Sequence, residues 1–383
     1  MRIIRLFILY ILLGTTTQLC AAEYDFLIGG IYYRINSISE RTLSVVSIDY
    51  KNGNTYSGDI VIPETINYNG QTLTVTELGN SAFENCVDLL SISIPASVIE
   101  IRSQCFYGCK NLKRITFLDG VSPIHVSINS EKGTGAYSYM TYYSRMFSDC
   151  KLNTVYIGRN ITYDFIYNIP RVKQAYPPFS NIENVTIGHM VDSIGYYFFE
   201  NTKIKNIKIA DNSKLHKIGE KSFRDSSELL NFEIPSTVDS LGTEAFQGCI
   251  RLKTISIPAN IKFIGQSVFM NGSINGEDAD SIRTVYSFSP NPIEIYDNVF
   301  GNSTYVNGVL YVPTGSRNAY LSTKGWRNFF NIQEMTPSSM LEIKEKKLTD
   351  AIIYNINGML SNKRSRINII KFSDGTIKKV LVK

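Results

Sequence analysis

The 383-residue sequence is poor in the side chains on which most catalytic and metal sites depend. Its three histidines, His125, His189 and His216, are scattered and form neither a His-x-x-x-His pair nor a nucleophile-elbow motif. Gly133-Thr134-Gly135 lacks the lysine and the strand–helix setting of a phosphate-binding loop. The sequence therefore predicts no enzyme activity and no cofactor.

A resident metal ion is not expected either. Glu277, Asp278 and Asp280 could supply the oxygen ligands that calcium prefers, but they do not follow the Asp-x-Asp-x-Asp-Gly order of a calcium-binding loop. Cys105 and Cys109 lack the two-pair spacing of a zinc site, and no histidine lies near them. We interpret the acidic stretch as a solvated loop.

The chain also lacks a hydrophobic run long enough to span a bilayer. Residues 1–22 combine a basic start, a short apolar run and small residues up to Ala22, which is typical of an export signal. A lipoprotein signal would make Cys20 the acylated residue, but Leu19 before it is larger than such signals use. We expect cleavage after Ala22 and an exported mature protein that starts at Glu23.

The body of the chain has no excess of positive charge. The formal net charge is +5, but residues 341–383 alone hold ten basic and four acidic residues. Without that tail and the two arginines of the export signal, 27 basic residues stand against 30 acidic ones. A mildly acidic body has no electrostatic footprint for nucleic acid, so we expect no nucleic-acid partner.

What the chain does have is a regular spacing of phenylalanines. The pattern Leu-Gly-x-x-Ala-Phe-x-x-Cys-x-x-Leu-x-x-Ile-x-Ile-Pro runs from Leu78 to Pro95 and again from Leu241 to Pro258. A period of this length predicts a repeat solenoid, in which each coil buries its apolar face against its neighbours. The rings that recur every 23 or 24 residues are Phe83 and Phe106, then Phe199, Phe223, Phe246 and Phe269.

Each coil is expected to contain one short strand from an Ile-x-Ile pair, such as Ile92 and Ile94, with both side chains inward. Successive strands should then form parallel ladders around an internal column of phenylalanines. The glycine of Ile264-Gly265 suits a tight bend between coils. Proline cannot donate to a ladder, so the prolines that follow such pairs should end the strands: Pro95, Pro235 and Pro258.

Five cysteines would remain after cleavage, and an odd count argues against a full disulfide framework. Four of them lie three residues after a phenylalanine of the repeat, and Cys105 fills the small-residue position that Ala82 and Ala245 occupy in other coils. We predict that all five pack in the core as small hydrophobes. They are Cys86, Cys105, Cys109, Cys150 and Cys249.

Two insertions break the period, one between Phe106 and Phe147 and one between Phe147 and Phe179. Insertions in solenoids form loops, and such loops often carry binding. Both are rich in tyrosine, which gives contact area at little entropic cost, although tyrosines also tile strand faces. The candidate ligand-binding residues are Tyr137, Tyr139, Tyr142, Tyr143, Tyr163, Tyr167 and Tyr176.

The repeated pattern that begins at Leu78 and at Leu241 resembles the BspA-type leucine-rich repeat, a family of bacterial surface proteins. Residues 309–316 are similar to the segment that usually ends such arrays. Through residues 354–358 and 373–383 the tail resembles the C-terminal sorting domain of the type IX secretion route, although it lacks the usual glycine and tyrosine before its last strands. The resemblance implies export, surface display and adhesion to host or bacterial partners.

The expected fold is a β-rich solenoid of the leucine-rich-repeat type, with short turns or helical pieces, between an N-terminal β cap and a small C-terminal β domain. The expected divisions are a signal peptide at 1–22, an N-terminal β-rich cap at 23–74, a solenoid at 75–313, a C-terminal cap at 314–336 and a sorting-domain-like β tail at 337–383.

The function that we expect is that of an exported, monomeric, adhesin-like binding protein, at the cell surface or outside the cell, which recognises a host or bacterial protein or glycan. The alternative is a glycan-processing enzyme, or a surface protein that recruits one, with its site in an insertion. Carboxylate pairs at hydrolytic separation would favour the alternative, and an exposed aromatic strip near residues 137–176 would favour binding. A purely structural role in a surface layer is left open.

Overall fold

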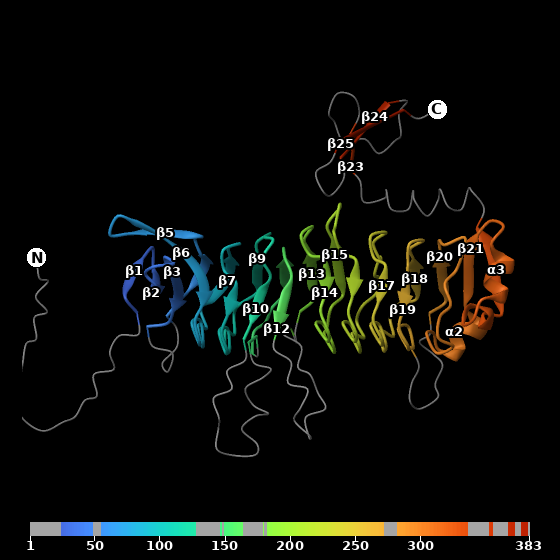
Figure 1. The fold of residues 1–383 in the computed structure, drawn as a ribbon, viewed down its shortest axis with the longest axis horizontal. Coiled ribbons are helices and arrows are strands. Elements are labelled where there is room, and N and C mark those ends of the chain that lie inside the picture. The colour runs from blue at the N-terminus through green and yellow to red at the C-terminus, as the bar shows by residue number, and fades with distance from the viewer. Residues whose placement is uncertain are drawn as a thin grey trace, which may run out of the picture.

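The computed structural model describes residues 24–48, 55–127, 146–147, 149–163, 179, 182–271 and 282–335, together with the backbone of 352–354, 367–371 and 377–381. The main body is an elongated stack of coils with strands along its sides (Figure 1). Among the described residues, helices occur only near the C-terminal end of this stack. The architecture is the β-rich repeat solenoid that the phenylalanine period predicted.

The N-terminal end of the stack is a meander of antiparallel strands. β1 (Phe26–Ile28) pairs with β2 (Ile31–Ser37), which pairs with β3 (Thr42–Val46). β3 then pairs in parallel with β6 (Gln71–Leu78), and β5 (Thr65–Tyr68) joins β6 as an antiparallel partner. These strands pair with the first coil and so occupy an edge that would otherwise present unpaired backbone groups.

The main ladder is built from the Ile-x-Ile pairs. Its register is continuous from coil to coil, so that Ile92 pairs with Ile115 and Ile115 pairs with Val155. Side chains alternate along a strand, and both apolar residues of each pair therefore point inward, as for Ile92 and Ile94. The predicted parallel ladder is confirmed. Its strands are β4 (Gly58–Val61), β7 (Leu89–Ile94), β9 (Arg114–Phe117), β11 (Thr154–Ile157), β13 (Asn184–Ile187), β15 (Asn206–Ile209), β18 (Thr254–Ile257), β20 (Thr284–Ser287), β21 (Val309–Pro313) and β22 (Asn331–Met335).

The main ladder is interrupted between β15 and β18, and the prediction that Pro235 ends a strand was wrong. Phe232 stands at the first ladder position, where most coils have isoleucine or valine. Its ring packs 5.2 Å from that of Phe223 and 4.8 Å from that of Phe246, measured between centroids. We infer that this large side chain, wedged between two rings of the column, holds the backbone before Pro235 out of strand geometry.

A second ladder runs along another side of the stack, and each of its two-residue strands sends one apolar residue inward, such as Ile264. The glycine that follows is needed for a reason that differs from the predicted bend. Gly265 has no positive φ, but a Cβ there would lie 2.4 Å from the backbone nitrogen of Thr243 in the previous coil. The strands are β6, β8 (Glu100–Ile101), β10 (Ile124–Val126), β12 (Ile161–Tyr163), β14 (Ser193–Ile194), β16 (Lys217–Ile218), β17 (Ser240–Leu241) and β19 (Phe263–Ile264).

The repeat phenylalanines form one continuous column inside the stack, which confirms the central prediction from the sequence. Consecutive ring centroids lie 5.1–5.9 Å apart with interplanar angles of 9–25°, the offset-stacked arrangement that aromatic rings prefer. Tyr56 extends the column beyond Phe83, and Phe329 and Trp326 pack against its last ring. The column contains Phe83, Phe106, Phe147, Phe179, Phe199, Phe223, Phe246, Phe269 and Phe300.

The five cysteines are free and buried, as predicted. Burial raises the pKa of Cys249 and Cys105 well above the ordinary thiol value. Both side chains are therefore uncharged thiols at neutral pH. Their chemistry is that of packing and weak hydrogen bonding rather than of nucleophilic attack.

The C-terminal end of the stack is closed by short helices and aromatic side chains. Tyr320, Trp326 and Phe329 are buried there, and the Tyr320 hydroxyl donates to the carbonyl oxygen of Ser289 at 2.7 Å. The main ladder continues one strand beyond Pro313, into β22. The helices are α2 (Asn302–Asn307), α3 (Arg317–Ser322) and η1 (Trp326–Asn328).

The tail contains three strands, β23 (Ile352–Tyr354), β24 (Ile367–Lys371) and β25 (Ile377–Leu381), which pair in antiparallel order. The expected export signal at residues 1–22 lies outside the described residues. None of the helices among the described residues has the length and apolar composition needed to cross a membrane.

Candidate ligand-binding surface

From β7 onward, the outer face of the main ladder is lined by one residue from each strand. Because both neighbours of this residue point inward, strand alternation directs it outward. These residues are partly or fully exposed, and most are neutral. They form a row, here called the outer row, that consists of Ser93, Thr116, Tyr156, Thr186, Lys208, Ser256, Tyr286, Tyr311 and Gln333.

Two tyrosines of the outer row stack on each other near the C-terminal end. Tyr286 on β20 and Tyr311 on β21 are register partners, with ring centroids 5.2 Å apart and an interplanar angle of 19°. The register partner of Tyr286 on its other side is Ser256, whose side chain is too small to cover an aromatic ring. Phe288 lies beside Tyr286 with its ring nearly parallel, 6.5 Å away. The pair thus offers one ring face and several ring edges to a ligand.

Tyr156 of the outer row belongs to a small polar cluster. Its hydroxyl donates to Oδ1 of Asp119 at 2.9 Å, and Nδ1 of His189 lies 3.7 Å from Oδ2 of the same carboxylate. Burial, and then the hydrogen bond to Asp119, raise the pKa of Tyr156 to about 12, so its hydroxyl stays protonated and donates. A Cβ on Gly188 would lie 2.8 Å from both Asp119 and Tyr156, so only glycine leaves this contact undisturbed. The cluster is exposed and polar, which suits hydrogen bonding to a ligand.

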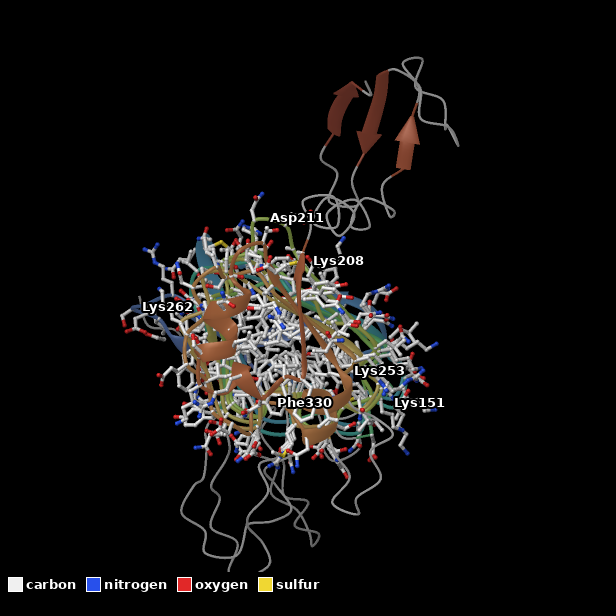
Figure 2. The ribbon with its side chains drawn as sticks, turned by 90° about the vertical axis from the view of Figure 1, so that its right-hand side faces the viewer. Lys151, Lys208, Asp211, Lys253, Lys262 and Phe330 are labelled. Carbon is white, nitrogen blue, oxygen red and sulfur yellow. The ribbon has the colours of Figure 1, made fainter. Side chains whose placement is uncertain are left out.

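Basic residues line one border of this outer face. At this border each coil buries one leucine or isoleucine just before the ladder strand, and basic side chains lie within two positions of it. Viewed along the stack, Lys151 and Lys253 project from the same corner, while Lys262 projects from the opposite side (Figure 2). We call this set the cationic row. It consists of Lys110, Lys113, Arg114, Lys151, Lys203, Lys205, Arg251, Lys253 and Arg283.

Among the described residues between Leu112 and Ile282, two acidic residues, Glu183 and Glu228, occupy the equivalent positions, and both are paired within the row. Nζ of Lys205 lies 3.2 Å from Glu183, and Nη1 of Arg251 lies 2.6 Å from Glu228. These pairs are exposed, so each contributes little to stability. The charge that is left on the border is positive.

Apart from Arg114, the strand position between the cationic row and the outer row holds neutral hydrogen-bonding side chains. Asn206 donates to Oδ1 of Asn184 at 2.9 Å, so amides of neighbouring coils form a chain along the ladder. Thr254 and Thr284 are register partners at the same position further along the stack. The outer face therefore changes from cations, through amides and hydroxyls, to hydroxyls and aromatic rings.

A polar pocket of about 290 Å³ lies where the N-terminal meander meets the first coils. Its walls include Asn36, Ser44, Glu77 and Arg102. These groups satisfy one another: Nη2 of Arg102 lies 2.9 Å from Oε2 of Glu77, and Oγ of Ser44 lies 2.5 Å from Oδ1 of Asn36 and 3.1 Å from Oε1 of Glu77. Ligand pockets are usually larger and mostly apolar, so we do not assign binding to this one.

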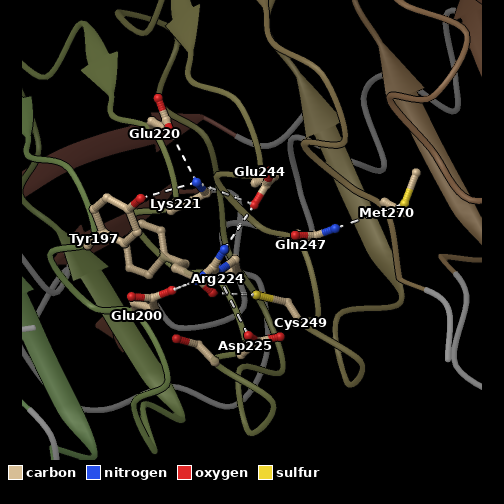
Figure 3. Close-up of polar contacts among 12 residues, drawn as sticks. Tyr197, Glu200, Glu220, Lys221, Arg224, Asp225, Glu244, Gln247, Cys249 and Met270 are labelled. Carbon is tan, nitrogen blue, oxygen red and sulfur yellow. Dashed lines mark hydrogen bonds and ion pairs between the residues drawn. The ribbon is translucent and has the colours of Figure 1, made fainter. Parts of the chain in front are cut away.

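A second polar cluster lies on the turns that carry the phenylalanines and ties three coils together (Figure 3). Arg224 forms ion pairs with Glu200 and with Glu244, whose Oε2 is 3.1 Å from Nη1. Nζ of Lys221 donates to the Tyr197 hydroxyl at 3.1 Å and lies 5.1 Å from the centroid of that ring. Opposite charges from neighbouring coils thus meet in pairs. We assign this cluster to stabilisation of the stack.

Of the seven tyrosines that the sequence predicted to bind ligand, only Tyr163 is among the described residues. Tyr163 ends β12, where it is half-buried, and its hydroxyl donates to the backbone carbonyl oxygen of Tyr196. Its ring packs 6.2 Å from that of Phe198, so it is apart from the outer row. The other predicted positions lie outside the described residues: Tyr137, Tyr139, Tyr142, Tyr143, Tyr167 and Tyr176.

The tyrosines of the outer row were not among the residues predicted from the sequence. The signal was present, because Tyr156 stands between Val155 and Ile157, and inward neighbours require an outward residue between them. In the part of the chain that the structure describes, no group of three histidine, cysteine or acidic side chains could hold a metal ion. The acidic stretch at 277–280 lies outside that part.

Comparison with known proteins identifies the repeats. The family described as BspA type Leucine rich repeat region matches residues 64–169 and 143–276, in six copies. No curated protein matches the chain.

Several solved structures are similar in fold to the chain. A leucine rich cell surface protein from Faecalibacterium prausnitzii is 19% identical, over 78% of this chain and 97% of its own, with a TM-score of 0.32. The pneumococcal vaccine antigen PcpA is 15% identical, over 81% of this chain and 98% of its own, with a TM-score of 0.34. A leucine-rich repeat protein from Bacteroides ovatus is 16% identical, over 82% of this chain and 100% of its own, with a TM-score of 0.26.

Proposed function

The chain belongs to the family of BspA type leucine-rich repeat proteins, and from that premise we propose that it is a surface-displayed, adhesin-like protein that binds an extracellular protein or glycan and catalyses no reaction. The observation that carries this proposal is the division between the inside and the outside of the stack. The repeat phenylalanines are buried in the core, and the two parts of the main ladder leave an outer face made mostly of hydroxyl, amide and aromatic side chains.

The shape of a solenoid supports binding rather than catalysis. Stacked coils present an extended surface whose side chains are held by the ladder at fixed intervals, so little ordering is needed when a ligand binds. Tyrosines such as Tyr156, Tyr286 and Tyr311 add contact area at low entropic cost. The cysteine thiols are buried in the core, where they are uncharged and poor nucleophiles.

The tyrosine-rich insertions remain part of the proposal. Tyr137, Tyr139, Tyr142 and Tyr143 follow Phe106 in the sequence, and Tyr167 and Tyr176 precede Phe179. Both insertions join coils whose strands, β9, β11 and β13, carry the middle of the outer row. We propose that these residues extend the binding surface beyond the ladder.

We further propose how the chain reaches its ligand. Residues 1–22 act as the export signal, 23–74 cap the solenoid of 75–313, and 314–336 close its other end. The tail at 337–383 acts as the sorting domain that places the protein at the cell surface. The small antiparallel sheet of the tail and its excess of basic residues are compatible with a sorting role. Deletion of the tail should leave the exported protein unattached to the cell.

The experiment that tests the function is an unbiased binding screen of the purified full chain against immobilised extracellular-matrix proteins and polysaccharides, run beside assays for glycoside and ester hydrolysis. Binding to at least one polymer, without turnover, is expected. Turnover by a pure sample that binds nothing would instead favour the glycan-processing alternative and end the proposal.

Two variants locate the surface. The change Tyr156→Ala/Tyr286→Ala/Tyr311→Ala removes the rings of the outer row and should weaken binding. The change Tyr139→Ala/Tyr142→Ala/Tyr143→Ala tests the insertion in the same way. Circular dichroism should report an intact fold in both, and a loss of folded signal in the second variant would mean that its rings belong to the core.

A further inference from the structure

We propose that the cationic row binds a linear polysaccharide that carries one carboxylate per disaccharide and lies along the stack. This proposal rests on the proposed binding function and names the chemical class of the ligand. It starts from the imbalance of charge at one border of the outer face, where the described residues include nine basic side chains and two acidic ones.

The charges that remain unpaired are distributed along this border. The side chains of Lys113, Lys151, Lys203 and Arg283 are exposed and make no ion pair with any described residue. The two acidic residues of this border already neutralise Lys205 and Arg251. Most surfaces intersperse charges of both signs, so a border of one sign attracts a polymer of the opposite sign.

The spacing of the row determines which polymer fits. Lys151 and Lys203 each stand directly before the buried residue of their coil and lie two coils apart, and strands of adjacent coils lie about 4.8 Å apart, so the two positions are separated by about 10 Å. That interval is comparable to the length of a disaccharide in an extended chain. From Lys113 to Arg283 the row covers six coil steps, or roughly 30 Å, which would accommodate several disaccharides.

The same spacing argues against nucleic acid as the occupant. Double-stranded DNA carries one charge per roughly 1.7 Å of its axis, so cations at intervals of two coils would leave most of its phosphates unneutralised. A polymer with sparse charges matches sparse cations, and each of its carboxylates can meet a lysine.

The neighbouring side chains favour a sugar over an acidic peptide. Directly beside the cationic row, Thr254 and Thr284 present hydroxyls and Asn184 and Asn206 present amides. These groups can exchange hydrogen bonds with the many hydroxyls of a polysaccharide. Further across the same face, the edge and the uncovered ring face of Tyr286 can contact the apolar face of a sugar ring. Across the outer face, one sugar chain could therefore contact the cations with its carboxylates, the amides and hydroxyls with its own hydroxyls, and the tyrosine ring with a sugar ring.

The test uses the full chain and hyaluronan fragments of defined length, with neutral dextran as the uncharged comparison and oligothymidylate as another polyanion. The row variant is Lys113→Glu/Lys151→Glu/Lys203→Glu. The control variant is Lys214→Glu/Lys217→Glu/Lys324→Glu, which changes the net charge equally at exposed lysines outside the row. Affinities are measured by titration calorimetry at low and at physiological salt, after circular dichroism has shown that both variants are folded.

We expect hyaluronan to bind the wild type and the control variant within about twofold of each other, and the row variant at least about tenfold more weakly, with a salt dependence that is reduced in the row variant. Dextran should not bind. The proposal is overturned if the row variant binds as the wild type does, if both variants are weakened equally, or if oligothymidylate binds as tightly as hyaluronan.

The failure of this proposal can be told apart from failure of the binding function. If the wild type and the row variant bind the same matrix protein or neutral glycan equally well, the cationic row is wrong as the site but the protein is still a binding protein. If neither binds any polymer and the wild type shows turnover, both proposals fail.

Discussion

The thiol of Cys249 donates a hydrogen bond to the backbone carbonyl oxygen of Phe223, with 3.1 Å between Sγ and the oxygen. The residue three positions after a repeat phenylalanine thus reaches back to the phenylalanine of the previous coil. Ser226 makes the same contact with Phe199, at 2.7 Å between Oγ and the oxygen. The repeat therefore requires a small side chain that can donate a hydrogen bond at this position, and cysteine is not the only residue that meets this requirement. Two further pairs repeat the contact: Cys109 with Phe83 and Cys150 with Phe106.

Exchange of sulfur for oxygen should consequently be tolerated at Cys249. We expect Cys249→Ser to lower the free energy of unfolding by less than about 1.5 kcal/mol, because size and donor are kept. Cys249→Val should cost more, since it removes the donor and adds a methyl group at a site that is 0% exposed. Urea denaturation followed by circular dichroism measures both. Equal losses in the two variants would show that the hydrogen bond is unimportant.

Gly242 and Gly195 occupy the same position in the repeat, but only Gly242 lies close to the backbone of the previous coil. We therefore expect the two positions to differ in how well they tolerate alanine. A Cβ on Gly242 would lie 2.4 Å from the backbone nitrogen of Glu220, whereas one on Gly195 would meet nothing nearer than 3.7 Å. Backbone atoms cannot give way locally, so Gly242→Ala should lower the unfolding free energy by about 1–3 kcal/mol, as overpacking does. Gly195→Ala should change it by less than about 0.5 kcal/mol. Similar effects at both positions would contradict the tight contact at Gly242.

The phenylalanine column makes a prediction about two phenylalanines in one coil of the stack. Phe246 is 0% exposed and stacks between two rings of the column, whereas Phe263 on β19 is 45% exposed. Phe246→Ala should cost about 3–5 kcal/mol of unfolding free energy. Phe263→Ala should cost within about 0.5 kcal/mol, as surface changes usually do. The ratio of the two losses in a urea titration tests the assignment of inside and outside.

The pair of Arg224 and Glu200 predicts a pH-dependent penalty. Burial raises the pKa of Glu200, and Arg224 opposes that shift. In Arg224→Met the carboxyl stays buried without its cation, so its pKa in the folded state moves further above the unfolded value. A carboxyl with a raised folded pKa contributes stability below the unfolded pKa and loses it as the pH rises through the folded pKa.

The penalty of Arg224→Met should therefore be small near pH 4, about the pKa of an unfolded glutamate, and should grow toward pH 7. At pH 7 we expect about 2 kcal/mol, below the range for fully buried pairs because the Arg224 side chain is 27% exposed. The double variant Arg224→Met/Glu200→Met should recover most of this loss and remove its pH dependence. A penalty that does not change between pH 4 and 7 would contradict the role given to Glu200.

The sequence predicted the fold because its strongest signal is periodic. Each repeat phenylalanine has the same surroundings, so the period alone implied a column, and the alternation around Ile92 and Ile94 implied an inward-facing ladder. The exception before Pro235 came from a single residue. Phe232 has the right polarity for the ladder but a ring large enough to enter the column, and side-chain size of this kind has no periodic signature.

The candidate surface was harder to predict than the core. The local density of tyrosines predicted binding in the insertions. Tyr286 and Tyr311, in contrast, are separated by 25 residues in the sequence and become neighbours only through the coil register. The cationic row was hidden for the same reason. Lys151 and Lys203 lie 52 residues apart, and the mildly acidic composition of the body masked a border of one charge.

Hydroxyl-radical footprinting of the native full chain, read out residue by residue by mass spectrometry, tests the central claim most directly. The nine column phenylalanines, such as Phe199 and Phe223, should stay unmodified until the chain is unfolded, while Tyr156, Tyr286 and Tyr311 should be modified in the native state. Rapid native-state modification of the column phenylalanines, together with protection of those tyrosines, would contradict it.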